Sequence, residues 1–152
     1  MRNQVQLITY PDRISNDLAG LREVLDHELD GLFGGVHILP FFTPHDGADA
    51  GFDPADHTQV DPRLGDWSDI ARLAQRYEVM ADVIVNHVSA DSPQFQDVVA
   101  RGAASRYDGL FLTPERVFPG GATEAELAAI YRPRPGRPFT QQPLADGTLR
   151  DC

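Results

Sequence analysis

Three short apolar runs separated by two amphipathic stretches constrain the fold of this chain more than any other feature of its sequence. The runs cover residues 5–10, 35–39 and 79–85, and the stretches between them, residues 17–29 and 66–77, carry apolar side chains at helical spacing. Strands that alternate with helices are typical of a parallel sheet with right-handed crossovers, either doubly wound or closed into a barrel. The sequence therefore predicts an α/β fold, and periodicity leaves both architectures open.

A Gly-, Asp- and Pro-rich stretch from Phe41 to Gly65 interrupts this alternation and is predicted to be a long loop. Loops of this length in a compact domain are commonly functional or disordered, and the aromatic residues in this one favour an ordered loop. Asp66, directly after it, is predicted to cap the helix that follows.

The pattern changes after residue 87. Apolar residues predict a short helix around Phe95 and an extended piece at residues 110–112, and Thr123 with Glu126 forms a capping box that predicts another helix. Prolines stiffen residues 131–138. No regular element is predicted after them.

The charge balance narrows the classes of partner. Of the 152 residues, 23 are Asp or Glu and 13 are Lys or Arg, all of them Arg, which gives a formal net charge of −10. An acidic chain lacks the basic face that displaces counterions from phosphates, so no nucleic acid partner is expected. Cys152 is the only cysteine, which excludes an internal disulfide. Because the sequence shows neither a signal peptide nor an apolar run of membrane-spanning length, no membrane partner is expected, and the expected compartment is the cytoplasm.

Polar side chains gather after the second and third apolar runs, where parallel α/β sheets bind ligands. Aromatic rings that cover C–H patches, with carboxylates and imidazoles that bond hydroxyls, suit a polyhydroxylated ligand, and a sugar is the simplest. Aspartates in such a loop are also frequent turn formers. A metal site at His45, Asp49 and His57 is a further alternative, although their spacing fits no zinc motif. The polar residues after the two runs are His45, Asp46, Asp49, Asp53, Asp56, His57, Asn86 and His87, and the aspartates weighed as turn formers are Asp46, Asp53, Asp56 and Asp61.

The arginines of residues 131–137 form the other candidate site. Arg132, Arg134 and Arg137 place three guanidiniums on a stiff segment of an otherwise acidic chain. Because Arg binds phosphate in a bidentate manner, the segment predicts a local anion site. A solvated surface loop is the alternative, and the residues alone leave both open.

Two motifs carry a resemblance to a known family. Asp82–His87 reads D-V-I-V-N-H and resembles the D-x-V-x-N-H motif at the end of the third strand in the α-amylase superfamily, glycoside hydrolase family thirteen, with Ile84 at the position of the motif's Val. Gly51–Gly65 resembles the stretch that follows the second strand there, although most amylases have Tyr where this chain has His57. Within the superfamily, the segments that look like the sucrose phosphorylases are residues 5–10, 35–42, 46–52 and 130–136.

The resemblance implies a TIM-type (β/α)8 barrel with a domain, called B, inserted after the third strand. Residues 1–87 are then expected to form the first three β/α units of the catalytic barrel, and residues 88–152 part of domain B. Because this barrel is incomplete, the chain is expected to be the amino-terminal part of a longer enzyme.

The resemblance also implies a set of substrate-binding residues. Asp49 and His87 are expected to bind hydroxyls of the glucosyl unit in the donor subsite, with Phe52 near its face. Tyr131 and Arg134 are expected on the acceptor side, where fructose or phosphate sits. Since sucrose phosphorylases resemble the metal-free branch of the superfamily, neither a metal ion nor a cofactor is expected.

The implied reaction converts sucrose and inorganic phosphate into α-glucose 1-phosphate and fructose with retention, through a covalent glucosyl-enzyme. The nucleophile and the acid/base are expected beyond Cys152, so no catalytic residue is assigned, the chain alone is expected to be inactive, and a homodimer is considered for the complete protein. The alternatives are a phosphorylase of sucrose 6-phosphate or glucosylglycerate, and a non-catalytic sugar-binding fragment. The D-G-A-D-A-G-F stretch at Asp46–Phe52 favours plain sucrose.

Overall fold

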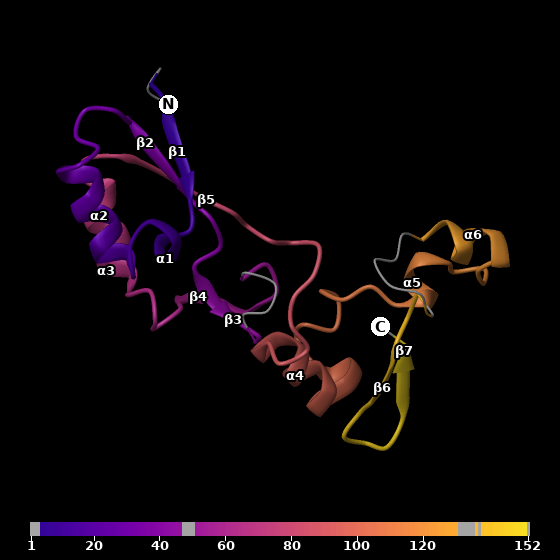
Figure 1. Cartoon of the computed structure of the whole chain (residues 1–152). Helices are drawn as coiled ribbons and strands as arrows, with labels where there is room; N and C mark the ends of the chain where they lie inside the picture. Colours follow the sequence, from indigo (N-terminus) through magenta and orange to yellow (C-terminus); the bar gives the residue numbers. More distant parts are fainter. Residues whose placement is uncertain (1–3, 47–50, 131–135, 137, 152) are drawn as a thin grey trace. The chain divides into compact units, whose positions relative to one another are not determined.

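The computed structural model describes residues 4–46, 51–130, 136 and 138–151. The chain divides into two compact units, Met1–Ser92 and Pro93–Cys152 (Figure 1). The first unit holds a parallel sheet with its helices, and the second holds short helices and a hairpin. None of the helices in the described part of the chain has the length and apolar character that a membrane span requires.

A three-stranded parallel sheet forms the centre of the first unit. Its strands lie in the order β1 (Gln6–Thr9), β2 (Gly35–Ile38) and β5 (Glu78–Ala81), each parallel to its neighbour. A short helix, α1 (Pro11–Ile14), follows β1 directly. The predicted α/β fold with a parallel sheet is confirmed.

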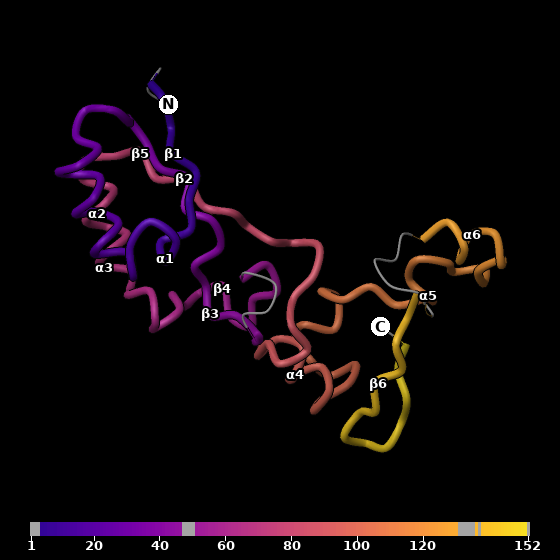
Figure 2. The backbone as a smooth tube through the Cα atoms, viewed as in Figure 1, coloured from indigo at the N-terminus to yellow at the C-terminus, as the bar shows by residue number. Residues whose placement is uncertain are grey.

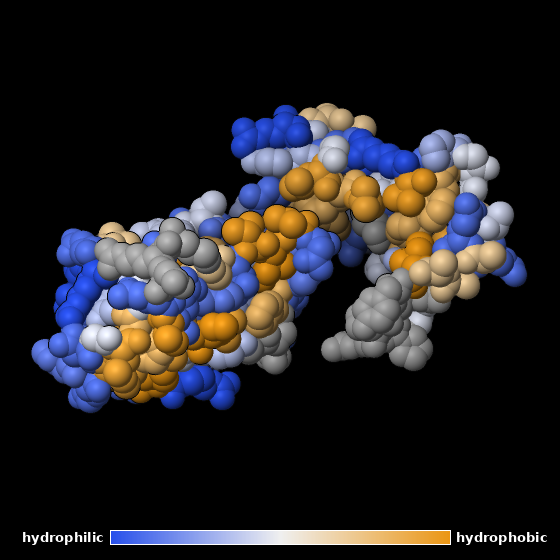
Figure 3. Space-filling view, turned by 90° about the horizontal axis from the view of Figure 1, so that it is seen from above, coloured by the Kyte–Doolittle hydropathy of each residue, from blue (hydrophilic) through white to orange (hydrophobic). Residues whose placement is uncertain are grey.

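The two faces of this sheet differ. Val36 and Ile38 of β2 are fully buried, whereas His37 between them lies on the opposite face, because successive side chains of a strand alternate. The register partners of His37, which are Ile8 and Met80, are exposed. Figure 3 shows apolar surface on the first unit, whose exposed large apolar residues are Val5, Ile8, Ile14, Leu32, Phe52, Trp67, Met80, Val83 and Val85.

Two helices, α2 (Leu18–Asp26) and α3 (Trp67–Ala74), lie side by side against the sheet (Figures 1 and 2). Asp17 caps α2, and Asp66 forms a capping box at the start of α3. Such side chains satisfy the backbone N–H groups of the first turn, which have no partner within the helix. The predicted cap at Asp66 is confirmed.

The core of the first unit lies between these helices and the sheet. Leu18, Leu21 and Leu25 of α2 are each fully buried. Complete burial of a leucine side chain is worth about 1.5–3 kcal/mol relative to exposure, so this leucine face holds α2 on the sheet. The other members of the core are Val36, Ile38, Phe41, Phe42, Val60, Leu73 and Tyr77.

The prediction of a loop throughout residues 41–65 is wrong. An antiparallel hairpin occupies much of this stretch, with strands β3 (Phe42–Pro44) and β4 (Pro54–Val60). Phe42 is buried, and its ring centroid is 4.7 Å from that of Phe41. Tertiary packing therefore stabilises strands that the Gly and Pro content of the sequence disfavours.

The third strand of the sheet is shorter than the predicted residues 79–85. Its pairing with β2 ends at Ala81, and Val83 and Val85 are 73% and 85% exposed. Within the described residues, no strand pairs with the other edge of β5. An apolar run of this kind predicts buried side chains, but Val83 and Val85 are not buried within the first unit.

The second unit confirms two predicted helices and contradicts one predicted extended piece. The helix near Phe95 forms, and Thr123 with Glu126 makes the expected capping box. Residues 110–112 form no strand: Leu110 ends a turn in which its N–H donates to the carbonyl of Tyr107 at 2.9 Å. The helices are α4 (Pro93–Arg101), η1 (Gly102–Ala104), α5 (Pro114–Val117) and α6 (Glu124–Ala129).

A second hairpin contradicts the prediction that nothing regular follows residue 138. Strands β6 (Gln141–Pro143) and β7 (Leu149–Asp151) pair antiparallel. In the turn between them Gly147 has a φ of 85°, and the Asp146 carboxylate accepts a hydrogen bond from the Thr148 N–H at 2.9 Å. An Asp-Gly pair is a strong hairpin signal, and the sequence prediction overlooked it.

Candidate functional site

The structure brings together two of the five predicted substrate-binding residues. Nε2 of His87 lies 2.7 Å from the carbonyl oxygen of Phe52, and both residues are exposed. Asp49, Tyr131 and Arg134 lie outside the described residues.

The contact with Phe52 determines what the His87 ring can offer to a ligand. A carbonyl oxygen only accepts hydrogen bonds, so Nε2 of His87 carries the proton and donates it. Within the described part of the chain, Nδ1 of the ring makes no hydrogen bond, and it can accept one from a ligand hydroxyl while the ring is neutral. The loop carbonyl thus fixes both the tautomer and the orientation of the ring.

The segment after His87 is attached to the hairpin by further hydrogen bonds. The Ser89 N–H donates to the carbonyl of Pro54 at 3.2 Å. Nδ1 of His45 lies 3.1 Å from Oγ of Ser89 and 2.9 Å from Oδ2 of Asp91. His45 was among the predicted polar residues, whereas Ser89 and Asp91 were missed because their partner is distant in sequence.

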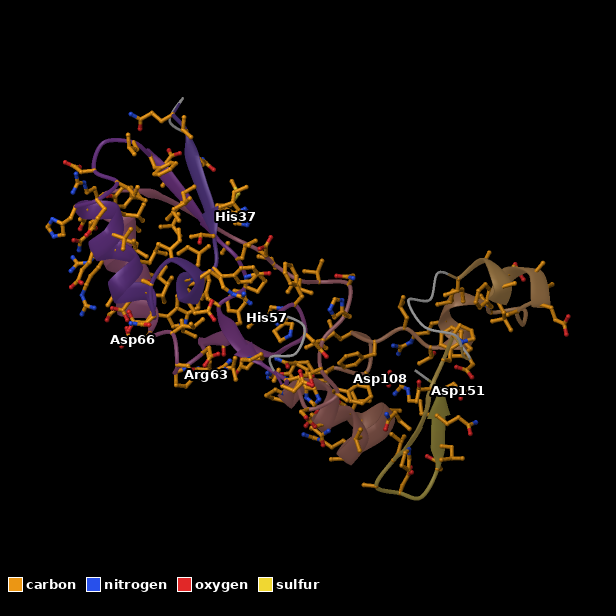
Figure 4. All side chains as sticks on the ribbon, viewed as in Figure 1. His37, His57, Arg63, Asp66, Asp108 and Asp151 are labelled. Carbon is orange, nitrogen blue, oxygen red and sulfur yellow. The ribbon has the colours of Figure 1, made fainter. Side chains whose placement is uncertain are left out.

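His57, on β4, has a different environment from His45. Its ring centroid is 5.5 Å from that of Phe42, and its Nε2 is a buried atom without a hydrogen-bond partner among the described residues (Figure 4). The described residues hold no group of three His, Cys, Asp or Glu side chains that could bind a metal ion. Asp49, the third residue of the alternative metal site, lies outside the described residues.

Two aspartates of the hairpin region serve the backbone around them. The Asp56 carboxylate accepts from the N–H and the hydroxyl of Thr58, at 2.8 and 2.7 Å. The Asp61 carboxylate accepts from the N–H of Arg63 at 2.9 Å and from its guanidinium. For Asp61, whose carbonyl accepts from the Leu64 N–H at 2.8 Å, the turn-forming alternative is confirmed, whereas Asp56 lies within β4.

The Asp61–Arg63 pair lines a cavity of about 320 Å³. Burial raises the pKa of the Asp61 carboxyl, but the hydrogen bonds and charge of Arg63 outweigh burial and hold that pKa below its ordinary value. The sequence prediction did not single out Arg63. The other lining residues are Tyr10, Pro11, Asp12, Arg13, Asn16, Pro40, Phe42, Pro44, Gly51 and Leu64.

A second histidine contact was also missed from the sequence. Nε2 of His37, at the centre of the exposed sheet face, lies 3.1 Å from Oδ2 of Asp82 (Figure 4). Asp82 begins the D-V-I-V-N-H motif, so this contact ties the start of the motif to the middle strand. The signal in the sequence was a histidine inside an apolar strand.

The fold and this arrangement of strand ends define the class of protein. The family described as alpha amylase, catalytic domain, matches residues 9–131, and the chain belongs to this family. The predicted fold class is thereby confirmed: the chain is a partial α/β fold with a parallel sheet, of the TIM-barrel type.

Individual proteins that resemble this chain narrow the similarity to one group of enzymes within the family. Sucrose phosphorylase from Bifidobacterium adolescentis is 57% identical over 149 residues, which cover 97% of this chain and 30% of that protein. Sucrose phosphorylase from Agrobacterium vitis is also 57% identical, over 99% of this chain and 31% of its own length. The crystal structure of sucrose 6F-phosphate phosphorylase from Thermoanaerobacter thermosaccharolyticum aligns with a TM-score of 0.87 and 33% identity, over 99% of this chain and 30% of that one. This chain therefore spans about 30% of the length of the relatives it matches.

Proposed function

We propose that this chain forms the donor side of the active site in a sucrose phosphorylase. The observation that carries the proposal is the identity of 57% over nearly the whole chain. The hydrogen bond between His87 and Phe52 supports it, because it brings two of the predicted donor-site residues into contact.

The proposed reaction proceeds by two displacements at the anomeric carbon. An enzyme carboxylate displaces fructose from sucrose, and phosphate then displaces that carboxylate to give α-glucose 1-phosphate, so two inversions restore the configuration. The proposal assigns neither this carboxylate nor the acid/base to a residue of this chain. The proposal assigns both to the part of the enzyme that this chain does not span.

The residues of this chain have binding roles in the proposal. Asp49 and His87 bond the glucosyl hydroxyls, and Nδ1 of His87 is the ring atom that accepts from one of them. Phe52 lies near the face of the sugar. Tyr131 and Arg134 serve the acceptor side, where fructose leaves and phosphate enters.

Several attributes of the complete protein remain part of the proposal. Residues 1–87 belong to the catalytic barrel and residues 88–152 to domain B. The proposed compartment is the cytoplasm, and a homodimer stays a prediction. The proposal includes no metal ion and no cofactor.

A chimera tests the proposed function. This chain replaces the aligned 149 residues of the Bifidobacterium adolescentis enzyme, and the products formed from sucrose and phosphate are followed by NMR. α-Glucose 1-phosphate and fructose are expected, while the 152-residue chain by itself gives no turnover. Formation of β-glucose 1-phosphate, or of free glucose as the main early product, overturns the proposal.

The same chimera separates the alternatives. More distant relatives, 42% identical, include a glucosylglycerol phosphorylase and a glucosylglycerate phosphorylase. If the graft shifts the preference of the enzyme from sucrose towards sucrose 6-phosphate or glucosylglycerate, that alternative replaces plain sucrose. If the chimera shows no turnover and the 152-residue chain alone binds sugar, the alternative of a non-catalytic sugar-binding fragment is favoured.

A further inference from the structure

The sheet does not fix the position of His87. The pairing of β5 with β2 ends at Ala81, and the exposed Val83 and Val85 lie between that point and the histidine. A segment beyond the end of a strand ladder has lost the hydrogen bonds that define its register. Other contacts must therefore hold His87 where it lies.

The hairpin supplies these contacts. His87 donates to the Phe52 carbonyl at 2.7 Å, and the Ser89 N–H donates to the Pro54 carbonyl at 3.2 Å. In addition, the ring of His45, which directly follows β3, contacts the side chains of Ser89 and Asp91 in the segment after His87. His45 is itself tied to the hairpin, because its N–H donates to the carbonyl of Asp53 at 2.9 Å.

The chemistry of the three side chains fixes their roles. A carboxylate only accepts, so the contact of 2.9 Å between Asp91 and Nδ1 of His45 places the proton on Nδ1. Oγ of Ser89, 3.1 Å from the same atom, is the second acceptor, and it also accepts from the Asp91 N–H at 3.1 Å. In a Ser-His-Asp triad the serine and the acid contact opposite ring nitrogens. Here both contact Nδ1 and Ser89 is buried, so Ser89 is not a nucleophile.

We propose that His45, Ser89 and Asp91 form a latch that holds His87 in position for the donor sugar. The three are positioning residues, and the inference rests on the proposed function. An exposed contact between a histidine and a carboxylate adds little to stability, and His45 and Asp91 are 42% and 65% exposed, so the main effect of the latch is on geometry. A displacement of about 1 Å at a catalytic site can cost about a hundredfold in rate.

Substitutions at His45 test the latch in the chimera. The side-chain nitrogen of Asn lies close to the position of Nδ1, whereas that of Gln lies close to the position of Nε2. His45→Ala, His45→Gln and Asp91→Ala should each lower kcat/KM for sucrose by about tenfold or more. His45→Asn, which keeps a donor at the position of Nδ1, should retain most of the kcat/KM of the unaltered chimera. His27→Ala, at an exposed histidine after α2, is the matched control and should leave kcat/KM unchanged.

NMR of the 152-residue chain provides a measurement that does not depend on activity. In the unaltered chain the Nε2–H signal of His87 should show the hydrogen bond to Phe52, and His45→Ala and Asp91→Ala should shift it, while His45→Asn and His27→Ala leave it in place. If that signal and the kinetics are the same in all variants, the latch is overturned. An inactive unaltered chimera whose His87 signal still responds to His45→Ala contradicts the proposed function and leaves the latch standing.

Discussion

His87 and Phe52, which are 35 positions apart, are joined by a hydrogen bond of 2.7 Å from Nε2 to the carbonyl oxygen. The family motif that ends in His87 and the loop that contains Phe52 are therefore coupled through one backbone group. Because the carbonyl holds Nε2–H, the opposite edge of the ring, with Nδ1, is the part that can meet a ligand.

This geometry predicts the effect of removing the imidazole. In the chimera, His87→Ala should lower kcat/KM for sucrose by more than about tenfold, because loss of a hydrogen bond that strengthens in the transition state costs about 2–4 kcal/mol. Asp49→Ala should have an effect of the same kind. Steady-state kinetics with circular dichroism checks the rate and the fold together, and His27→Ala is the control. Unaltered kinetics in a folded variant would remove that residue from the site.

The parts of the fold that the sequence predicted depend on local signals. Asp66 and Thr123 cap helices because a short polar side chain precedes an apolar periodic stretch, and both are visible within a few residues. The β3–β4 hairpin was missed because Phe42 gains its packing from residues distant in sequence. No local pattern carries that information.

The candidate site divides in the same way. His87 and Phe52 were predicted as site residues because each lies in a segment that resembles the family. The partners of His45 and His37, which are Asp91 and Asp82, follow only from the paths of separate segments in space. Residue type and spacing do not indicate such pairs.

The second prediction concerns phosphate. Phosphate must compete with water at roughly 55 M for the glucosyl-enzyme, so a group that binds and orients the anion is needed. Arg134 is the candidate, because prolines on both sides restrict its backbone and a guanidinium pairs well with a dianion. In the chimera, Arg134→Ala should raise the KM for phosphate and the fraction of hydrolysis, with a smaller effect on cleavage of sucrose.

Arg137→Ala is the matched control for Arg134, since it removes the same charge from the same segment. Both variants are assayed over a range of phosphate concentrations, with glucose and glucose 1-phosphate measured separately. If Arg134→Ala leaves the phosphate KM and the product ratio unchanged, the segment is a solvated surface loop. Equal effects of the two substitutions would indicate general attraction of anions instead of a specific contact.

The third prediction concerns the core. Leu25 of α2 is fully buried, so Leu25→Ala in the 152-residue chain should lower the free energy of unfolding by about 2–5 kcal/mol through lost burial and a residual cavity. Leu32 is 60% exposed, and Leu32→Ala should change it by no more than about 0.5 kcal/mol. Urea denaturation followed by circular dichroism measures both. Similar values for the two variants would contradict the assignment of the leucine face of α2 to the core.

The fourth prediction concerns acid. Burial raises the pKa of the Asp61 carboxyl, but the hydrogen bonds and charge of Arg63 outweigh it, so the folded pKa lies below the value of the unfolded chain. As the pH falls below about 4, the unfolded chain takes up a proton at Asp61 before the folded chain does. The stability that this carboxylate contributes is therefore present at pH 7 and is lost as the pH falls through the folded pKa.

Arg63→Ala should weaken this contribution, because burial still raises the Asp61 pKa while, of the groups of residue 63 that lower it, only the backbone N–H remains. The difference in unfolding free energy between the unaltered chain and Arg63→Ala should thus be larger at pH 7 than at pH 3, as urea denaturation at both pH values can measure. Arg13→Ala is the matched control, since the Arg13 side chain is 72% exposed and its Nε lies 3.9 Å from Oδ1 of the exposed Asp12, a long and weak contact. Its effect should be small and the same at both pH values. A difference for Arg63→Ala that does not change with pH would mean that the ion pair with Asp61 does not contribute to stability.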